Sequence, residues 1–437
     1  MLGVIGIIIS LAIIIVGAYK GWHVFPLAVL GGIIVALCNH MGLWTALSTN
    51  FAAGWMSWAG GYFLLFALGA LFGELMAVSG AARSIAYKIS DLFGASRTPI
   101  AIAVITLVLT YGGINSFVVA FTLYPLAMVM CNEANIPRSL AVAGMLLGAG
   151  TATQTSLPGT PSTQNLVPTT LLGTTSTAAP AIGIVCGIIM VVCGIVYLSW
   201  QTKVYKKKGI GFVSLPQDGL GDGSVVRTEA PNFGISLLPI IVVIVCIFAT
   251  KNALPALASV SLSLFIGCVL TTLFFWKRLP DKKGIINKGF SSSIAPLMNT
   301  AAIIGYGTVV QASPAFQSII LFAQNLQMNP YATVAIGVNI LAGVSGSSSG
   351  GLKIFLESMG QFFLDQGVNA EALHRVAAVA SGGLDTLPHN GAVISMFAIF
   401  GTNHKESYRH VFVLCCALPI IATIVAVIMA NAMYPIV

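Results

Sequence analysis

Apolar segments of roughly 20 residues recur from one end of the chain to the other, and each is long enough to cross a bilayer as a helix. Clear examples are LGVIGIIISLAIIIVGA (2–18), SLLPIIVVIVCIFAT (236–250) and VFVLCCALPIIATIVAVIMANAM (411–433). These segments are continuous and do not alternate apolar with polar positions, as the strands of a membrane barrel do. The pattern therefore predicts an all-α polytopic membrane protein.

Four of the apolar segments are interrupted by glycine, proline and small polar residues. They are TYGGINSF (110–117), TATQTSLPGTPSTQN (151–165), AGVSGSSSGG (342–351) and SGGLDTLPHNG (381–391). Pro158 and Pro388 each remove a backbone donor, and proline stops a helix. Backbone that leaves a helix inside the bilayer must be buried in protein or line a watery cavity. The four breaks are therefore the predicted functional region.

The two halves of the chain share residues in the same order, which predicts an internal repeat. The matches pair Gly73 with Gly307, Ser84 with Ser318, Ile85 with Ile319, Arg138 with Arg375, and Pro158 with Pro388. We expect a first transmembrane half at 1–202 (repeat 1 at about 50–200) and a second at 233–437 (repeat 2 at about 285–435). The polar stretch 203–232 is the predicted cytoplasmic linker. Repeats that carry broken segments at corresponding positions are typical of secondary transporters.

Composition and charge support this interpretation. Only 7% of the 437 residues are charged and 57% are hydrophobic, whereas soluble domains carry about 25% charged residues. The net charge of +8 is concentrated in WQTKVYKKKG (200–209) and WKRLPDKKGIINKG (276–289). Two apolar segments separate these clusters, so both lie on one side, which the positive-inside rule makes the cytoplasm. Such short clusters do not favour nucleic-acid binding.

The chemistry of the breaks predicts a small, polar, negatively charged ligand. Half-helix N-termini present unpaired N–H groups that favour an anion. The candidate substrate ligands are the polar residues of the breaks: Asn115, Ser116, Thr155, Ser156, Thr160, Ser347, Ser348, Ser349, Thr386, His389 and Asn390. The sequence contains no G-x-x-x-x-G-K-[ST] motif, no metal-ligand spacing and no C-x-x-C pair among its eight cysteines. We therefore expect no cofactor and no use of ATP.

Two stretches, GSSSGGLKIFLESMG (346–360) and EALHRVAAVASGGLDTLPHNGAVI (371–394), resemble the gluconate permease family of bacterial transporters. The resemblance is close in the second half and looser in the first half. It implies proton-coupled uptake of hydroxylated organic acids across the cytoplasmic (inner) membrane of a bacterium. It also implies two inverted repeats, each with a re-entrant hairpin and an interrupted helix, in an elevator-type homodimer. The implied hairpin tips are 112–116 and 345–351, and the interrupted helices are at 155–161 and 385–391.

Three titratable residues are candidates for proton coupling, and each has a structural alternative. His389 can cycle a proton near neutral pH, or it only caps the break. Asp385 is a proton carrier or a partner of His389, or it is an N-cap. Glu74 lies in an apolar run and is a coupling residue or an internally paired acid.

Other charged residues have structural interpretations. Lys353 and Glu357 have the i, i+4 spacing of an intrahelical ion pair. Arg138 and Arg375 follow polar turns, and we expect them to be interfacial anchors. The first break also has more residues between Arg138 and Leu157 than the second has between Arg375 and Leu387, so we expect it to be longer.

The prediction is a secondary active transporter for small hydroxylated monocarboxylates, such as gluconate or 3-hydroxybutyrate, with a proton as the coupling ion. Coupling to Na⁺ stays open, since carbonyls of a broken helix can hold that ion. A passive channel is a further alternative. GVSG (343–346) and GSSSG (346–350) match serine hydrolase patterns, but an intramembrane hydrolase has no use for breaks in both halves.

Overall fold

A computed structural model describes residues 2–218, 230–250, 253–324 and 328–436, and every regular element in these ranges is a helix. Within them, eight helices are long and apolar enough to cross a membrane. The eight spans are 2–19, 43–78, 116–134, 180–207, 233–250, 257–274, 282–311 and 404–433. The prediction of an all-α polytopic membrane protein is confirmed.

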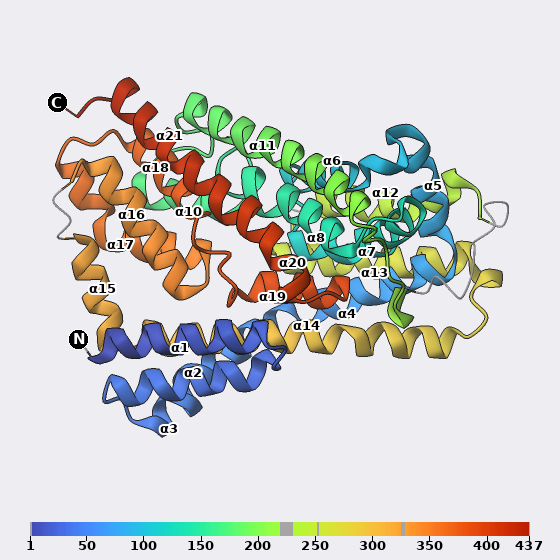
Figure 1. Cartoon of the computed structure of the whole chain (residues 1–437), viewed down its shortest axis with the longest axis horizontal. Helices are drawn as coiled ribbons and strands as arrows, with labels where there is room; N and C mark the ends of the chain where they lie inside the picture. The colour runs from blue at the N-terminus through green and yellow to red at the C-terminus, as the bar shows by residue number, and fades with distance from the viewer. Residues whose placement is uncertain (1, 219–229, 251–252, 325–327, 437) are drawn as a thin grey trace.

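Figure 1 shows the helices, most of which run roughly along the long axis of the molecule. Two helices and a short helical turn precede α4: α1 (Leu2–Tyr19), α2 (Val24–Cys38) and α3 (Leu43–Thr45). Two further helices separate the halves: α12 (Phe233–Thr250) and α13 (Ala256–Phe274). The predicted linker is partly helical, because α11 continues to Lys207, and its residues 219–229 lie outside the described ranges.

The same order of elements occurs twice: a long helix, a short helix, a helical hairpin, a broken helix and a final long helix. In the first half these are α4 (Ala52–Val78), α5 (Ala81–Phe93), α6 (Thr98–Tyr111) with α7 (Ser116–Ala134), α8 (Arg138–Leu147) with α9 (Thr153–Thr155) and α10 (Thr163–Leu172), and α11 (Pro180–Lys207). In the second half these are α14 (Lys282–Gln311), α15 (Pro314–Gln324), α16 (Pro330–Ser345) with α17 (Ser348–Asp365), α18 (Ala370–Ala380) with α19 (Gly391–Phe400), and α20 (His404–Val411) with α21 (Leu418–Met433). The division into two repeats remains a prediction that this order supports.

The equivalent long helices α4 and α14 pack against each other in opposite directions. At one end, the Thr308 hydroxyl donates over 2.8 Å to the carbonyl of Asn50, in the π-helical turn Ala46–Phe51 that leads into α4. At the other end, Lys288 and Glu74 form an ion pair at 2.8 Å. The residue numbers rise along one helix as they fall along the other, which is the arrangement that inverted repeats predict.

Both predicted interrupted helices are interrupted, but the expected difference in length is wrong. The first break covers residues 156–162 and the second covers residues 381–390. The extra residues of the first half continue the helix through a π-helical turn, Gly148–Ala152. A Cβ atom at Gly148 would lie 2.5 Å from the carbonyl oxygen of Ala103, so glycine allows this turn to pack directly on α6. Isolated π-turns are frequent at functional sites.

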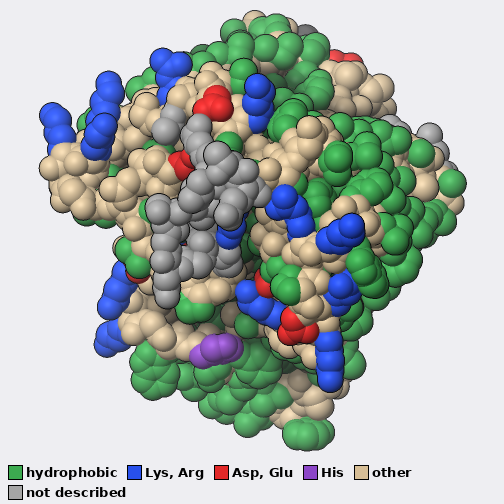
Figure 2. Space-filling model, turned by 90° about the vertical axis from the view of Figure 1, so that its right-hand side faces the viewer, with side chains coloured by type: hydrophobic (Ala, Val, Ile, Leu, Met, Phe, Trp, Pro, Cys, Tyr) green, Lys and Arg blue, Asp and Glu red, His purple; other side chains and the backbone are tan. Residues whose placement is uncertain are grey.

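Lys and Arg side chains gather on the end of the molecule that Figure 2 faces. In Figure 1 this is the end at which α11 terminates and α14 begins. The clusters at 200–209 and 276–289 therefore share one end, as the sequence predicts, and that this end is cytoplasmic remains a prediction of the positive-inside rule.

Arg138 and Arg375 are not interfacial anchors, because both are buried, with relative exposures of 6% and 0%. Arg138 pairs with Asp218 at 2.9 Å and donates to the carbonyl of Phe400 over 2.9 Å. The two arginines are also not equivalent, since Arg138 begins α8 whereas Arg375 is the sixth residue of α18. Their match in the sequence therefore does not correspond to the same position in the two helices.

Candidate functional site

The tip of the first hairpin and the first helix break enclose a polar cavity of about 310 Å³, which is within the range of small-molecule sites. The tip touches the break directly, because a Cβ atom at Gly113 would lie 2.7 Å from the ring of Pro161. The lining is uncharged and rich in hydroxyls and amides: Tyr62, Thr110, Gly113, Ile114, Asn115, Ser116, Ala149, Thr153, Gln154, Pro161, Ser162, Thr163, Gln164, Leu257 and Val260. This wall can bind hydroxyl groups and a carboxylate by neutral hydrogen bonds.

Two helices begin at the cavity wall, and their caps hold the wall in place. Asn115 is the N-cap of α7, and its side chain accepts from the N–H of Phe117 over 2.9 Å. Ser162 is the N-cap of α10, and its hydroxyl accepts from the N–H of Asn165 over 3.3 Å. The other N–H groups of a helix's first turn have no intrahelical partner, and the positive end of the helix dipole favours an anion.

The tip of the second hairpin lies on the second break. Gly346 has a left-handed φ of +62°, and its missing Cβ would lie 3.1 Å from the ring of His389, so glycine is required there. Asn390 donates to the carbonyl of Gly346 over 3.0 Å and to that of Asp385 over 2.8 Å. Its Oδ1 also caps α19 by accepting from the N–H of Val393. Asn390 thus joins the tip, the break and the following helix.

His389 and Asp385 are the unsatisfied polar groups of the second break. The His389 ring is 1% exposed, and neither of its nitrogens has a hydrogen-bond partner among the described residues. The carbonyl of Gly343 faces the ring without reaching hydrogen-bond geometry. Asp385 is 5% exposed, and its Oδ1 has no partner in the described part of the chain. Buried polar atoms without partners are rare and point to a role in the working protein.

The two halves meet through side chains of the breaks and tips. Gln164, in the wall of the cavity, donates to the hydroxyl of Ser348 over 3.0 Å. Ser348 in turn shares a hydrogen bond of 3.0 Å with Ser381. The breaks also touch directly, because a Cβ atom at Gly382 would lie 2.9 Å from the side chain of Thr155. A hydrogen-bonded path therefore leads from the cavity to the second break.

Arg375 lies behind the first break. Its guanidinium donates to the carbonyls of Ser156 (3.1 Å), Ser176 (3.2 Å) and Ala178 (3.0 Å) and to Oδ1 of Asn165 (3.0 Å). All four acceptors are neutral. Because Ser156 begins the break and Asn165 lies just beyond it, this one side chain from the second half fixes the shape of the break in the first half.

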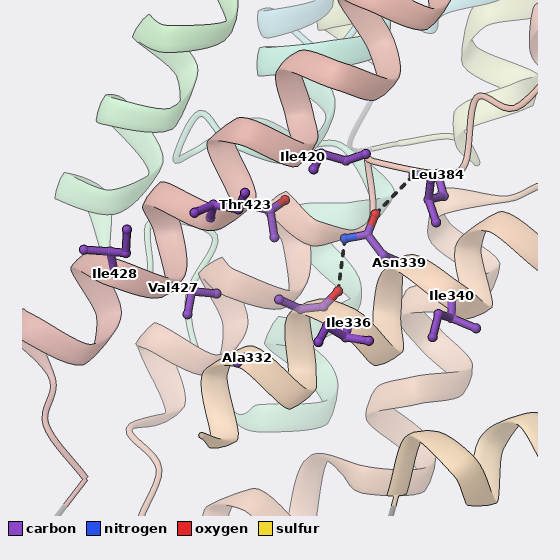
Figure 3. A pocket seen from close by; sticks show the side chains of 11 residues that line it. Ala332, Ile336, Asn339, Ile340, Leu384, Ile420, Thr423, Val427 and Ile428 are labelled. Carbon is purple, nitrogen blue, oxygen red and sulfur yellow. Dashed lines mark hydrogen bonds between the residues drawn. The ribbon is translucent and has the colours of Figure 1, made fainter. Parts of the chain in front are cut away.

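A second cavity of about 430 Å³ lies between α16 and α21 (Figure 3). Isoleucine and valine side chains line it, and its polar groups are Asn339 and Thr423. Asn339 is occupied, since it donates to the carbonyl of Ala335 over 3.0 Å and accepts from the N–H of Leu384 over 3.1 Å. This apolar cavity does not suit a hydroxylated anion, so the polar cavity is the candidate substrate site.

Comparisons with known proteins place this architecture in a family. The sequence model of the GntP family permeases matches residues 1–348. The chain belongs to the GntP permease family. The match ends at the tip of the second hairpin, so it does not extend over most of the second-half motifs that suggested the family from the sequence.

Relatives of this GntP permease are transporters. An uncharacterized transporter, YxjC, of Bacillus subtilis is 33% identical over 93% of this chain and 94% of its own. A high-affinity gluconate transporter of Escherichia coli is 28% identical over 63% of this chain and 62% of its own. The crystal structure of the YdaH transporter of Alcanivorax borkumensis covers 90% of both chains at 12% identity with a TM-score of 0.41.

The family excludes the enzyme alternative: the protein is a permease and not a hydrolase. The serine at the nucleophile position of each hydrolase-like pattern is hydrogen-bonded within the protein. Ser345 donates to the carbonyl of Leu341 over 2.7 Å, and Ser348 accepts from the side-chain amide of Gln164 over 3.0 Å.

The structure brings only some of the predicted ligands to the polar cavity of this permease. Asn115 and Ser116 line it. The others lie outside its lining: Thr155, Ser156, Thr160, Ser347, Ser348, Ser349, Thr386, His389 and Asn390. Thr155 and Ser156 bond to carbonyls of their own helix, and Thr386 bonds to the carbonyl of Cys415. The sequence reasoning missed Gln154 and Gln164, although both lie within the break that it singled out.

The remaining charged candidates are paired. Glu74 binds Lys288, as its structural alternative proposed, and its side chain is 13% exposed. Lys353 and Glu357 lie 3.7 Å apart as the predicted i, i+4 pair, with both side chains exposed. Pairing with Lys288 makes Glu74 a weaker coupling candidate than Asp385.

Proposed function

We propose that this permease imports small hydroxylated monocarboxylates, such as gluconate or 3-hydroxybutyrate, together with protons across the cytoplasmic membrane of a bacterium. The observation that carries the proposal is the polar, uncharged cavity bounded by the starts of α7 and α10. The substrate carboxylate binds first-turn N–H groups and nearby hydroxyls, and the substrate hydroxyls bind Gln154, Gln164 and Thr153. The gluconate transporter among the relatives supports this substrate class.

His389 and Asp385 are the proposed proton-coupling pair, and Glu74 is a further candidate. Both members of the pair belong to the second break, and each has a buried polar atom without a partner. An unpaired charge in that position is costly, so the pair favours states in which neither side chain carries an unpaired charge, and a proton must move when the charge changes. The path through Ser381, Ser348 and Gln164 supports communication between these residues and the cavity.

The proposed cycle is an elevator movement in a homodimer. The hairpins and broken helices of both halves form the moving unit, and the antiparallel pair α4 and α14 belongs to the scaffold. Hydrogen bonds between the halves at Gln164 and Ser348 support a moving unit that travels as one body.

Uptake into proteoliposomes of the purified full-length protein tests the proposal. Labelled gluconate and labelled 3-hydroxybutyrate are presented in parallel, first with an inwardly directed proton gradient and then with a protonophore. Uphill accumulation that disappears with the protonophore is the expected result. Accumulation driven by a Na⁺ gradient alone would replace the proton by Na⁺, and absence of uptake for both acids would overturn the proposed substrate class.

Gln154 offers a test of the cavity as the substrate site. Its side chain lines the cavity and makes no hydrogen bond to the described residues, so it is free to bind a substrate. Gln154→Ala is expected to raise the Kd for the transported acid by roughly 3- to 10-fold, the value of one neutral hydrogen bond. The matched control is Gln361→Ala, which removes an exposed glutamine bonded to Asp365 on α17. Isothermal titration of the detergent-solubilised protein measures both, and an equal change in the two variants would contradict the assignment.

A further inference from the structure

Arg375 is a buried cation for which the described residues provide no anionic partner. Its side chain is completely buried, and its four hydrogen bonds all go to neutral oxygens. We infer that Arg375 supplies the positive charge that makes the cavity of the first half select an anion. The inference deepens the proposed function and rests on it, because it assigns the charge preference of the same cavity.

The position of Arg375 places this charge directly behind the cavity wall. Its guanidinium bonds to the side chain of Asn165, and the preceding residue, Gln164, lines the cavity. It also bonds to the carbonyl of Ser156, where the first break begins. The guanidinium therefore contacts a residue that adjoins the lining in the sequence, on the side of the cavity where α10 begins.

Groups around Arg375 do not neutralise it. His374 bonds to Oδ1 of Asn165 over 3.2 Å and to the hydroxyl of Thr174 over 2.7 Å, and both partners are neutral. Glu371, one turn earlier on α18, is exposed and accepts from the N–H of Ala179 over 3.3 Å, on the far side of the peptide whose carbonyl Arg375 holds, so it forms no ion pair with Arg375 and solvent screens its charge. The nearest carboxylate on its own helix thus serves another helix end.

A buried charge without a counter-ion is unfavourable, and a bound carboxylate provides that counter-ion. The side chains of the cavity lining are uncharged, so apart from the two helix N-termini the lining would bind a polyol and a sugar acid by similar hydrogen bonds. Two unit charges about 10 Å apart, at an effective dielectric constant of about 20, change affinity by roughly ten-fold. Arginine suits the position, because its planar fork can hold several backbone carbonyls while it stays charged.

Charge variants separate this role from a purely structural one. Arg375→Gln removes the charge, and Arg375→Lys keeps it while losing hydrogen bonds. Cys186→Asp keeps Arg375 and adds a carboxylate near it, since the buried Cys186 lies one helical turn beyond Gly183, where a Cβ atom would lie 3.2 Å from the Arg375 side chain. Cys186→Ser is its neutral control.

Affinity for gluconate and for gluconamide, its neutral isostere, is measured by isothermal titration on folded, monodisperse full-length protein. Arg375→Gln and Cys186→Asp are both expected to lose roughly ten-fold in gluconate affinity. The affinity for gluconamide is expected to stay as in the wild type. Arg375→Lys and Cys186→Ser are expected to keep the preference for the anion.

Each result either supports or contradicts the role of the Arg375 charge in anion selection. Equal losses for both ligands would show that Arg375 only holds the break, and unchanged gluconate affinity in Cys186→Asp would also overturn the inference. If Arg375→Gln does not fold, the comparison of Cys186→Asp with Cys186→Ser decides alone. A wild-type protein that binds neither gluconate nor 3-hydroxybutyrate would instead overturn the proposed function, and the inference would fall with it.

Discussion

His389→Ala is expected to abolish proton-driven accumulation of substrate, while exchange of substrate between the two sides of the membrane continues. The imidazole is buried beneath the tip of the second hairpin, against Gly346, with both nitrogens unsatisfied. Histidine is the side chain whose proton exchanges most readily near neutral pH. Alanine cannot carry the proton, so the gradient loses its link to the substrate.

Exchange of substrate distinguishes a role of His389 in proton coupling from a role in holding the second break. His389 lies outside the lining of the polar cavity, and its ring nitrogens have no hydrogen-bond partner among the described residues, so counterflow of labelled gluconate should remain measurable in His389→Ala. Asp385→Asn is expected to behave in the same way, because it preserves the shape of the side chain and removes its charge. Counterflow and accumulation are both assayed in proteoliposomes, at matched protein content.

His40→Asn is the matched control, because His40 is exposed and has a positive φ of 54°, which asparagine tolerates. This variant should accumulate substrate like the wild type. If His389→Ala loses counterflow as completely as accumulation, His389 only holds the second break. Normal accumulation in both His389→Ala and Asp385→Asn would remove the pair from the coupling mechanism.

The sequence predicts the positions of the breaks well, because proline and glycine interrupt helices through local chemistry. Pro158 and Pro388 both lie inside observed breaks, and both hairpin tips occur where glycines and serines gather. The length of the first break was predicted wrongly. Whether residues 148–152 leave the helix depends on how closely they pack on α6. The sequence of this segment alone does not predict a contact with another helix.

The candidate site was predicted only in part, for a related reason. Hydroxyl and amide side chains mark the breaks, but the sequence does not show which of them turn inward to bond their own helix. Thr155 and Ser156 do so, whereas Gln154, between Thr153 and Thr155, faces the cavity. Neighbouring residues on a helix point in different directions, so the cavity wall depends on the rotation of the helix at the break.

The two arginines show the limit of reading charge from the sequence. Each follows a polar turn, which is where interfacial anchors occur, yet each side chain runs into the protein. Arg375 reaches a carbonyl of a break that precedes it by some 200 positions in the chain, and Arg138 reaches Asp218 in the linker. Partners so distant in sequence leave no local pattern.

Arg138→Ala is expected to destabilise the protein by about 3–5 kcal/mol, the effect of removing one partner of a buried ion pair. The Asp218 side chain is 0% exposed and would keep its charge without a cation. It would retain the hydroxyl of Tyr124 at 2.7 Å, which does not neutralise it. The free energy of unfolding in mixed micelles measures the effect.

The loss of stability in Arg138→Ala is compared with that of a double variant, which also removes the Asp218 charge, and with that of a variant that breaks an exposed ion pair. In the double variant Arg138→Met with Asp218→Asn, no charge stays buried, so its loss should be smaller than that of Arg138→Ala, although one more residue is changed. Lys353→Ala breaks an exposed pair and should cost about 0.5 kcal/mol or less. Because Arg138 also binds the carbonyl of Phe400, it links the linker to the helix after the second break. A loss in Arg138→Ala no larger than in Lys353→Ala would mean that the linker contributes little to holding the two halves together.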